Sequence, residues 1–288
     1  MNTSTLSAQG SLTLTPSVID PADQAEHRQV CPLIVVTPTY NEAGNLNELV
    51  QRLLALPLPE LRVLVVDDNS PDGTGKLADE IAHTTQRVAV LHRTTKNGLG
   101  RAYIDGFTAA LNGLPWTTPF TPEWVVQMDA DGSHPVEAIP GLLGTALAAR
   151  AQLVIGSRYV PGGSIDGEWG INRRWLSAFG NWYLERILHL GIRDATAGFK
   201  VWSADTLRML NLSRVGAAGY AFQAEMNYLA VRSGCRVVEV PIHFTDRRAG
   251  ASKMSFGVKV ESALRPWSLR WRYRRQRREV SGGQAVRV

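Results

Sequence analysis

Two aspartates one residue apart, Asp129 and Asp131, are the side chains of this sequence best placed to do chemistry. They follow residues 124–128, a mostly apolar and β-branched run that predicts a buried strand ending before Gly132. Residues i and i+2 of an extended segment point the same way, so both carboxylates can face one point. Two such charges need a cation, and hard oxygen ligands select Mg²⁺ or Mn²⁺. The pair predicts a divalent-cation site, with a solvated surface turn as the alternative.

The elements that must position this pair alternate between strands and helices. Apolar runs at 33–37, 61–66, 87–91 and 153–155 predict further strands, and apolar residues at helical spacing predict helices between them. This order predicts an α/β fold, a mostly parallel sheet with helices on both faces. Ligands bind at the carboxyl ends of such strands. Glu42, Asp67 and Asp68 follow the first two strands, so their carboxylates should share one sheet edge with the pair, as in a nucleotide and metal site.

The sequence lacks the glycine-rich loops that hold phosphates in many nucleotide-binding proteins. No G-x-G-x-x-G follows the first strand and no Walker-type lysine is present, which argues against a dinucleotide enzyme or an ATPase. The phosphates must then be held by the metal and by basic side chains. Such side chains occur in the second half of the chain, at Arg158, at Arg173 and in the segment from Arg247 to Lys253.

Length and composition fit one sizeable domain. Of the 288 residues 44% are hydrophobic, yet no apolar run reaches the ~20 residues of a membrane-spanning helix, and the N-terminus has no secretory-signal pattern. Residues 1–29, rich in Ser, Thr and Pro, are expected to form a disordered leader, 30–262 the folded domain, and 263–288 a basic amphipathic or disordered tail. Cys31 and Cys235 fit small buried thiols in a reducing cytoplasm.

Five motifs in this order suggest a family. They are Thr37-Pro38-Thr39-Tyr40-Asn41-Glu42, Val66-Asp67-Asp68-Asn69-Ser70-Pro71-Asp72-Gly73, Asp129-Ala130-Asp131 with His134-Pro135, Ser157-Arg158-Tyr159, and Arg247-x-x-Gly250-x-Ser252-Lys253. Together they resemble the dolichol (polyprenol) phosphate mannose synthases, which are family-2 inverting glycosyltransferases of the GT-A fold. The match runs from about residue 33 to 260, so the resemblance implies that residues 30–262 form a GT-A (Rossmann-like) glycosyltransferase domain.

The resemblance also implies roles for individual residues. The guanosine part of GDP-mannose should be cradled by Pro38, Tyr40, Glu42, Val66 and Asp68. The metal, diphosphate and sugar should meet Asp129, Ala130 and Asp131, and the phosphates should be surrounded by Arg158, Arg173, Arg247 and Lys253. Asp131, Arg247 and Lys253 are the residues expected to act in catalysis. Two positions depart from the family pattern, Ser133 where Gln is usual and Ser177-Ala178-Phe179-Gly180-Asn181 where Ser-Arg-Gly-Ala-Asn is frequent.

The reaction implied is transfer of mannose from GDP-mannose to a membrane polyprenyl phosphate, with Mg²⁺ or Mn²⁺ as cofactor. A polyprenyl-phosphate glucosyltransferase that uses UDP-glucose would share nearly all these motifs. Processive polysaccharide synthases carry Gln-x-x-Arg-Trp, but the nearest segment in this chain, from Trp267 to Trp271, lacks the Gln. A membrane-surface adaptor without activity would explain the basic tail, but it leaves the carboxylates unexplained.

The basic tail is the remaining unusual feature. Between Arg265 and Arg278 there are seven arginines and no acidic residue, a pattern that also suits nucleic acid or a solvated tail. A polyprenyl phosphate acceptor favours a membrane surface instead. We expect Trp267, Leu269, Trp271 and Tyr273 to enter the headgroup layer while the arginines face anionic lipid. The enzyme would then be cytoplasmic and peripheral on the inner face of the plasma membrane, with a polytopic membrane protein as the other candidate anchor and no nucleic acid partner.

Overall fold

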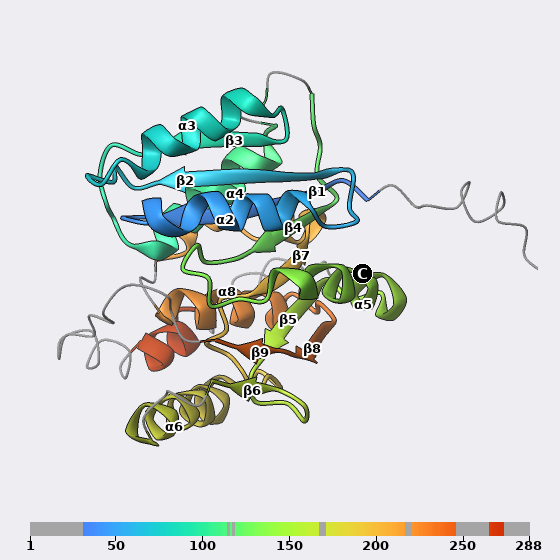
Figure 1. Cartoon of the computed structure of the whole chain (residues 1–288). Helices are drawn as coiled ribbons and strands as arrows, with labels where there is room; N and C mark the ends of the chain where they lie inside the picture. The colour runs from blue at the N-terminus through green and yellow to red at the C-terminus, as the bar shows by residue number, and fades with distance from the viewer. Residues whose placement is uncertain are drawn as a thin grey trace, which may run out of the picture. The chain divides into compact units, whose positions relative to one another are not determined.

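The computed structural model describes residues 31–113, 116, 119–166, 171–216, 220–245 and 265–273, without the side chains of 171–174 and 220. The expected leader, Arg247 and Lys253 therefore lie outside the described residues. Strands alternate with helices along the chain (Figure 1). In the first half, the elements are β1 (Leu33–Thr39), α2 (Ala43–Leu54), β2 (Leu61–Asp67), α3 (Thr74–Thr84), β3 (Val88–His92), α4 (Leu99–Leu111), β4 (Trp124–Gln127), η1 (Val136–Ala138) and α5 (Ile139–Ala149). In the second half, they are β5 (Leu153–Ser157), β6 (Ser164–Ile165), α6 (Ile171–Leu188), β7 (Lys200–Ser203), α7 (Ala204–Met209), η2 (Leu212–Arg214), α8 (Tyr220–Arg232), β8 (Val237–Pro241) and β9 (His243–Phe244).

The main sheet has seven strands in the order β3-β2-β1-β4-β7-β5-β8. All neighbouring pairs are parallel except the two that involve β7. The predicted α/β fold with a mostly parallel sheet is confirmed. Strand β7 lies between β4 and β5 and runs antiparallel to both.

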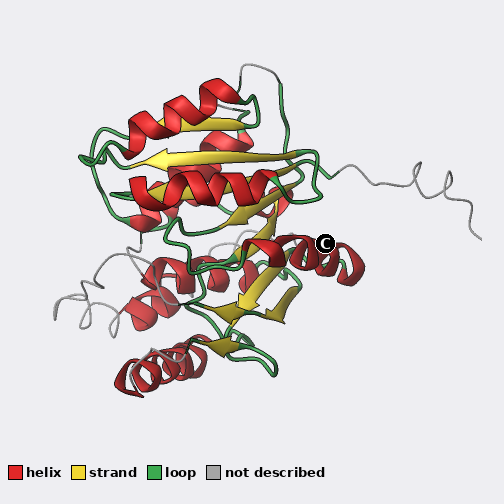
Figure 2. Cartoon of the chain, viewed as in Figure 1, coloured by secondary structure: helices red, strands yellow, loops and turns green. Residues whose placement is uncertain are grey.

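Helices cover both faces of the sheet, as Figure 2 shows by colour. Every residue of β1 is buried, and its side chains alternate between two cores. Leu33 and Val35 face the core that includes residues of α2, α3 and α5. Ile34 and Val36 face the core that includes residues of α4, α6 and α8. Burial on both faces explains why the strand reads as a continuous apolar run.

Strand β1 runs farther than the sequence predicts, through Pro38 to Thr39. The neighbouring strand β4 ends opposite Val36, so beyond that residue β1 pairs with β2 alone. Proline has no backbone N–H, and a strand end with one neighbour tolerates that loss. The extension carries Tyr40 and Glu42 to the same sheet edge as the end of β4.

The start of the basic tail is part of the fold. Residues 265–273 are helical, and Leu269 and Tyr273 are only 2% and 6% exposed. The Tyr273 hydroxyl donates to Glu225 Oε1 of α8 at 3.1 Å, and Arg270 Nη1 donates to the Ile187 carbonyl at the end of α6 at 2.9 Å. The expectation that Leu269 and Tyr273 enter a lipid headgroup layer is therefore wrong, since both pack into the protein core. No helix among the described residues has the length and apolar character needed to cross a membrane.

A buried lysine lies at the centre of the sheet. Lys200, the first residue of β7, has no exposed surface, and its Nζ donates to Gln223 Oε1 of α8 at 2.7 Å. Gln127, the β4 residue opposite Lys200, donates Nε2 to the same oxygen at 2.7 Å. Its own Oε1 accepts from Trp202 Nε1 at 3.2 Å. This polar cluster ties β4, β7 and α8 together directly behind the strand end that carries Asp129.

Burial lowers the pKa of Lys200 from 10.5 to about 7, although the charges of Asp194 and Asp129 oppose the shift. Between pH 7 and pH 10.5 the unfolded chain therefore binds more protons than the folded protein, so the free energy of unfolding should rise with pH across that window. Below about pH 7 Lys200 is charged in both states, and the free energy of unfolding is reduced by the full cost of burying that charge. We expect the free energy of unfolding of the wild type to gain about 2 kcal/mol between pH 7 and about pH 9 relative to Lys200→Met. Urea unfolding of both proteins at the two pH values measures this gain. A wild-type-minus-variant difference that is flat with pH would contradict it.

Candidate functional site

The loop after β4 places Asp129 and Asp131 at the carboxyl end of that strand, as predicted. Asp131 is 6% exposed and Ala130 is 3% exposed, so the loop is packed against the domain. Gly132 adopts a φ of 75°, the left-handed conformation that turns the chain sharply after Asp131. Thr245 holds the far side of this turn, because its Oγ1 donates to the Gly132 carbonyl at 3.2 Å. The loop is therefore a fixed feature of the sheet edge.

A buried tyrosine orients Asp129. The Tyr103 hydroxyl of α4 donates to Asp129 Oδ1 at 2.6 Å, and the Tyr103 ring stacks on Phe222 of α8 with centroids 5.8 Å apart. Burial, reinforced by the charge of Asp129, raises the pKa of Tyr103 well above its usual value. The phenol consequently stays protonated and acts as a hydrogen-bond donor to the carboxylate.

Ser133 orients Asp131 in a similar way. Its Oγ donates to Asp131 Oδ1 at 2.6 Å, and its backbone N–H donates to the same oxygen at 3.1 Å. Ser133 is 1% exposed. The serine that replaces the usual glutamine of the family thus acts on Asp131 through hydrogen bonds.

His134 supports the loop from the other side. Its Nδ1 accepts the Asp129 N–H at 3.2 Å, and its ring stacks on Phe199 with centroids 5.2 Å apart. Gly198 lies against this arrangement, because a Cβ there would come within 3.2 Å of Asp129 Oδ2. His134 is therefore a hydrogen-bonding residue of the loop.

The two carboxylates suit a divalent cation in their chemistry. Each has one oxygen held by a hydroxyl, from Tyr103 or Ser133, and a carboxylate has about four acceptor positions. Within the described residues, no group of three or more His, Cys, Asp or Glu side chains could hold a metal ion. The donor set therefore fits Mg²⁺ or Mn²⁺ bound by two carboxylates, with substrate phosphates and water as the remaining ligands.

Two further carboxylates lie at the end of β2, Asp67 as its last residue and Asp68 directly after it, and they have different surroundings. Asp67 accepts from Ser70 Oγ at 2.6 Å and from Thr39 Oγ1 at 3.2 Å, so it fixes the turn after the strand. Asp68 is 5% exposed and forms an ion pair with Arg93. Burial raises the pKa of Asp68, and the hydrogen bond and charge of Arg93 oppose that rise. Of these two carboxylates, Asp68 is the one that is paired with a basic side chain, the guanidinium of Arg93.

An exposed aromatic ring, that of Tyr40, follows β1, and a lysine from the loop after β3 lies over it. Tyr40 is 37% exposed, and Lys96 Nζ lies 3.3 Å from its ring centroid, in a cation–π contact. Glu42 is the N-cap residue directly before α2. Its N–H donates to Thr74 Oγ1 at 2.9 Å and its Oε2 accepts from Asn45 Nδ2 at 2.8 Å. Because β2, β1 and β4 are neighbours, Tyr40, Glu42 and Asp68 lie along the same edge as Asp129 and Asp131.

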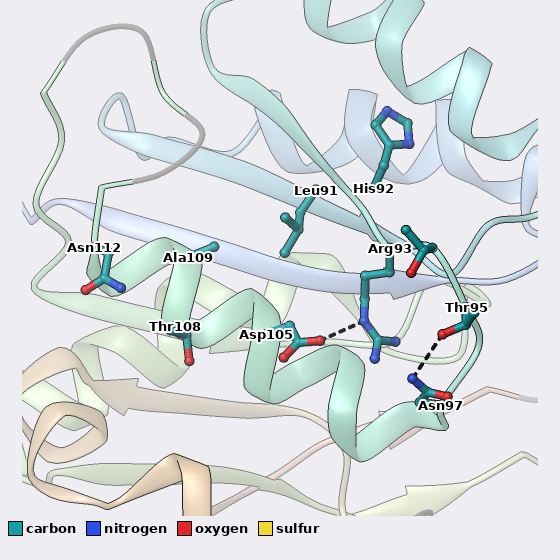
Figure 3. A pocket seen from close by; sticks show the side chains of 10 residues that line it. Leu91, His92, Arg93, Thr95, Asn97, Asp105, Thr108, Ala109 and Asn112 are labelled. Carbon is teal, nitrogen blue, oxygen red and sulfur yellow. Dashed lines mark hydrogen bonds and ion pairs between the residues drawn. The ribbon is translucent and has the colours of Figure 1, made fainter.

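A hollow beside this edge is lined by residues at the end of β3 and along α4 (Figure 3). Arg93 lies on its wall, with its Nε 2.8 Å from Asp105 Oδ2. The α4 residues that line it, from Asp105 to Asn112, project from the side of the helix opposite Tyr103. The lining residues do not include Asp129 or Asp131, and Arg93 on the wall of the hollow is the ion-pair partner of Asp68.

Arg158 is committed to an ion pair within the protein. Its Nε and Nη2 donate to the two oxygens of Asp194 at 2.8 and 2.7 Å, and Nη2 also donates to Thr196 Oγ1 at 2.9 Å. Asp194 is fully buried. The arginine fixes the segment before β7 to the end of β5, and a direct phosphate contact remains a prediction.

The remaining predicted residues divide into two groups. Pro38 and Val66 lie at the expected strand ends, but their side chains are buried. Arg173 lies in α6, where side chains up to residue 174 are not described, and Arg247 and Lys253 fall outside the described residues. Their roles in binding the nucleotide and phosphates stay predictions.

Sequence reasoning missed Tyr103, Arg93, Lys96 and Lys200. Tyr103 lies at helical spacing from Leu99 and Phe107, and this periodicity alone marks it as a core residue. Its hydroxyl was the available signal, because a buried phenol usually finds a hydrogen-bond partner. Arg93 and Lys96 follow a predicted strand, yet isolated basic residues give no pattern to detect.

Two proteins of known activity are similar to this chain in sequence over most of their length. Polyprenol monophosphomannose synthase of Mycolicibacterium smegmatis is 44% identical over 259 residues, which is 88% of this chain and 94% of that protein. Undecaprenyl-phosphate mannosyltransferase of Micrococcus luteus is 44% identical over 243 residues, 83% of this chain and 96% of that protein.

A solved structure agrees in fold. The mannosyltransferase from Pyrobaculum calidifontis in complex with GDP-Man and Mn²⁺ matches 84% of this chain with a TM-score of 0.55 and 18% identity. The match spans 64% of that protein, slightly less than two thirds of its length. Residues 34–208, more than half of the chain, match the family described as glycosyl transferase family 2. The chain therefore belongs to glycosyl transferase family 2.

Proposed function

We propose that this protein transfers mannose from GDP-mannose to a membrane polyprenyl phosphate, with inversion at the sugar carbon, to supply polyprenyl-phosphate-mannose for lipoglycan or protein mannosylation. The observation that carries the proposal is the pair Asp129 and Asp131 at the carboxyl end of β4, each oriented by a hydroxyl. The 44% identity to two polyprenyl-type mannosyltransferases over most of their length supports the choice of donor and acceptor.

The acceptor chemistry fits a site without an obvious general base. A phosphate monoester has a second pKa of about 6, so its oxygen is largely dianionic and already nucleophilic at neutral pH. That oxygen attacks the sugar carbon while the bond from this carbon to the diphosphate breaks and GDP leaves. The Nδ1 atom of His134 accepts a hydrogen bond from the Asp129 N–H, which agrees with a reaction that needs no base from the loop.

The main barrier is then the repulsion between an anionic acceptor and an anionic diphosphate. Asp129 and Asp131 would hold Mg²⁺ or Mn²⁺, which would neutralise part of the diphosphate charge and that of the departing GDP. Basic side chains of this chain would supply the rest. We assign that role to Arg173, Arg247 and Lys253, with Arg158 acting through its ion pair to Asp194.

The nucleotide would lie along the edge formed by β2, β1 and β4. Tyr40 offers a partly exposed ring beside Lys96, and Asp68 and Glu42 offer carboxylates to a base or ribose. Pro38 and Val66 are buried, so they would shape the floor of this edge. Trp267 and Trp271 are exposed. We propose that these two side chains and the residues after Tyr273 contact anionic lipid at the inner face of the plasma membrane.

The test of this function compares two donors. The purified protein is incubated with polyprenyl phosphate, Mn²⁺ and either labelled GDP-mannose or labelled UDP-glucose, and the product is extracted into organic solvent. We expect label in the organic phase from GDP-mannose and only background from UDP-glucose. Label transferred faster from UDP-glucose would make the protein a glucosyltransferase, and no transfer from either donor would reject the activity.

Asp131→Ala should abolish transfer, because Asp129 alone cannot hold the cation against the diphosphate. Binding of GDP-mannose should lose its dependence on Mn²⁺. Calorimetric titration with and without Mn²⁺ measures this dependence, and the organic-extraction assay measures turnover.

Asp67→Asn is the matched control, since Asp67 is a buried carboxylate of the same edge that is bonded to Ser70 and Thr39. It should keep the metal dependence of nucleotide binding. Near-normal turnover by Asp131→Ala would contradict the metal assignment.

Tyr103→Phe removes the hydroxyl that orients Asp129 and preserves the stacked ring. A hydrogen bond to a charged group contributes about 1.5–3 kcal/mol, so the Mn²⁺ concentration for half-maximal activity should rise about tenfold or more. The rate at saturating Mn²⁺ should change much less, because the metal restores the carboxylate position once bound. Tyr228→Phe, at a buried tyrosine of α8 outside the loop, should leave the Mn²⁺ titration unchanged. An unshifted titration in Tyr103→Phe would reject its positioning role.

A further inference from the structure

One side of α6 exposes large apolar side chains. Trp175, Phe179 and Trp182 are 73%, 57% and 60% exposed, and Leu176 beside them is 50% exposed. The three aromatic residues are spaced four and three apart, so they form one stripe along the helix. The opposite side of α6 packs into the core through residues such as Leu184 and Ile187. A soluble surface rarely carries such a cluster of exposed apolar residues without an interaction to explain it.

The stripe continues onto the helix 265–273. Phe179 stacks on Tyr183 with centroids 6.2 Å apart, and the Tyr183 hydroxyl accepts from Trp267 Nε1 at 3.1 Å. Trp267 and Trp271, one helical turn apart, are themselves 56% and 67% exposed. In Figure 1, α6 lies at the lower edge of the view, with the red helix 265–273 between it and α8. Two elements far apart in sequence thus build one aromatic face, made of Trp175, Leu176, Phe179, Trp182, Trp267 and Trp271.

The charge of these two helices is strongly positive. Residues 171–188 and 265–273 contain six arginines, and Glu185 is their single acidic residue. The Glu185 carboxylate accepts the backbone N–H groups of Leu190 and Gly191 at 3.0 and 3.2 Å, so it is held against the end of α6. Tryptophan and phenylalanine on a basic helix are the features of a segment that lies in the interface of an anionic membrane.

The inner side of α6 is linked to the candidate site. Asn181, 4% exposed, accepts the Thr196 N–H at 3.1 Å, and Thr196 Oγ1 accepts from Arg158. The aromatic face is therefore separated from the Arg158 corner by about one helix diameter, roughly 10 Å. A membrane that covered this face would lie on the outer side of the helix whose inner side contacts the Arg158 corner.

We propose that the aromatic face of α6 and the helix 265–273 is a docking surface for an anionic lipid bilayer. The proposal rests on the proposed function, in which the acceptor is a membrane lipid, and it moves the main membrane contact from the tail to α6. The indole and phenyl rings enter the headgroup layer. Arg186, which is exposed one helical turn beyond Trp182, faces anionic lipid phosphates, whereas Arg270 and Arg272 contact the Ile187 carbonyl and Glu225 within the protein.

The test uses the full chain and vesicles of phosphatidylcholine with and without phosphatidylglycerol. Trp175→Ser with Phe179→Ser removes apolar surface that is already exposed, so the fold should be kept. We expect the lipid concentration for half-maximal cosedimentation to rise at least about tenfold, while Met209→Ser, at an exposed apolar residue of α7, stays within about twofold of the wild type. Leucine at both positions should retain more vesicle binding than serine, because the contact is apolar.

A second measurement separates docking from activity. Transfer to a short-chain polyprenyl phosphate in solution should be unchanged in the serine variant, which also shows that it is folded. Wild-type vesicle binding by the serine variant would overturn the proposal, and so would equal binding to vesicles without phosphatidylglycerol. If the substitutions split a dimer and leave vesicle binding unchanged, the face binds a second copy and the proposal is overturned. The serine variant could lose vesicle binding while the wild type transfers no mannose in the donor assay. That pair of results would support the docking surface and reject the proposed function.

Discussion

The close approach of two like charges at the end of β4 is the constraint on which the rest of the site depends. Asp129 and Asp131 are held in place by hydroxyls of Tyr103 and Ser133, and the backbone N–H of Asp129 is bonded to His134. These bonds orient the carboxylates without neutralising them. Within the described part of the chain, no cluster of three potential ligands completes a cation site. In the proposed function the two carboxylates would form half of a metal site, and a nucleotide diphosphate would supply the other half.

The interior behind this strand end is polar where a sheet core is usually apolar. Hydrogen bonds among Lys200, Gln127 and Gln223 connect β7, β4 and α8. The negative charges of Asp194 and Asp129 favour the protonated form of Lys200. Burial lowers the pKa of Lys200 to about 7, so its charge at neutral pH is reduced relative to an exposed lysine. The hydrogen bonds to Gln223 tie this part of the sheet to α8, the helix whose Glu225 also accepts from the Tyr273 hydroxyl.

Much of the fold could be predicted because most strands are buried on both faces and read as apolar runs, as at residues 33–37 and 61–66. The direction of β7 could not, since a short strand carries no signal for parallel or antiparallel pairing. The carboxylates at the strand ends were found from their position after those runs. Tyr103 was hidden by the helical period that marks it as core. Leu269 and Tyr273 were assigned to lipid because an amphipathic pattern does not tell whether its apolar side meets a membrane or the domain.

The most direct test of the central claim is Mn²⁺ binding to the purified protein with and without GDP, followed through the electron paramagnetic resonance signal of free Mn²⁺. If the two carboxylates form half of a site, a single Mn²⁺ per chain should bind roughly tenfold or more tightly when GDP is present. Mn²⁺ that binds equally well without GDP would mean that the protein supplies the complete ligand set. That result would contradict the claim that Asp129 and Asp131 form only half of the metal site.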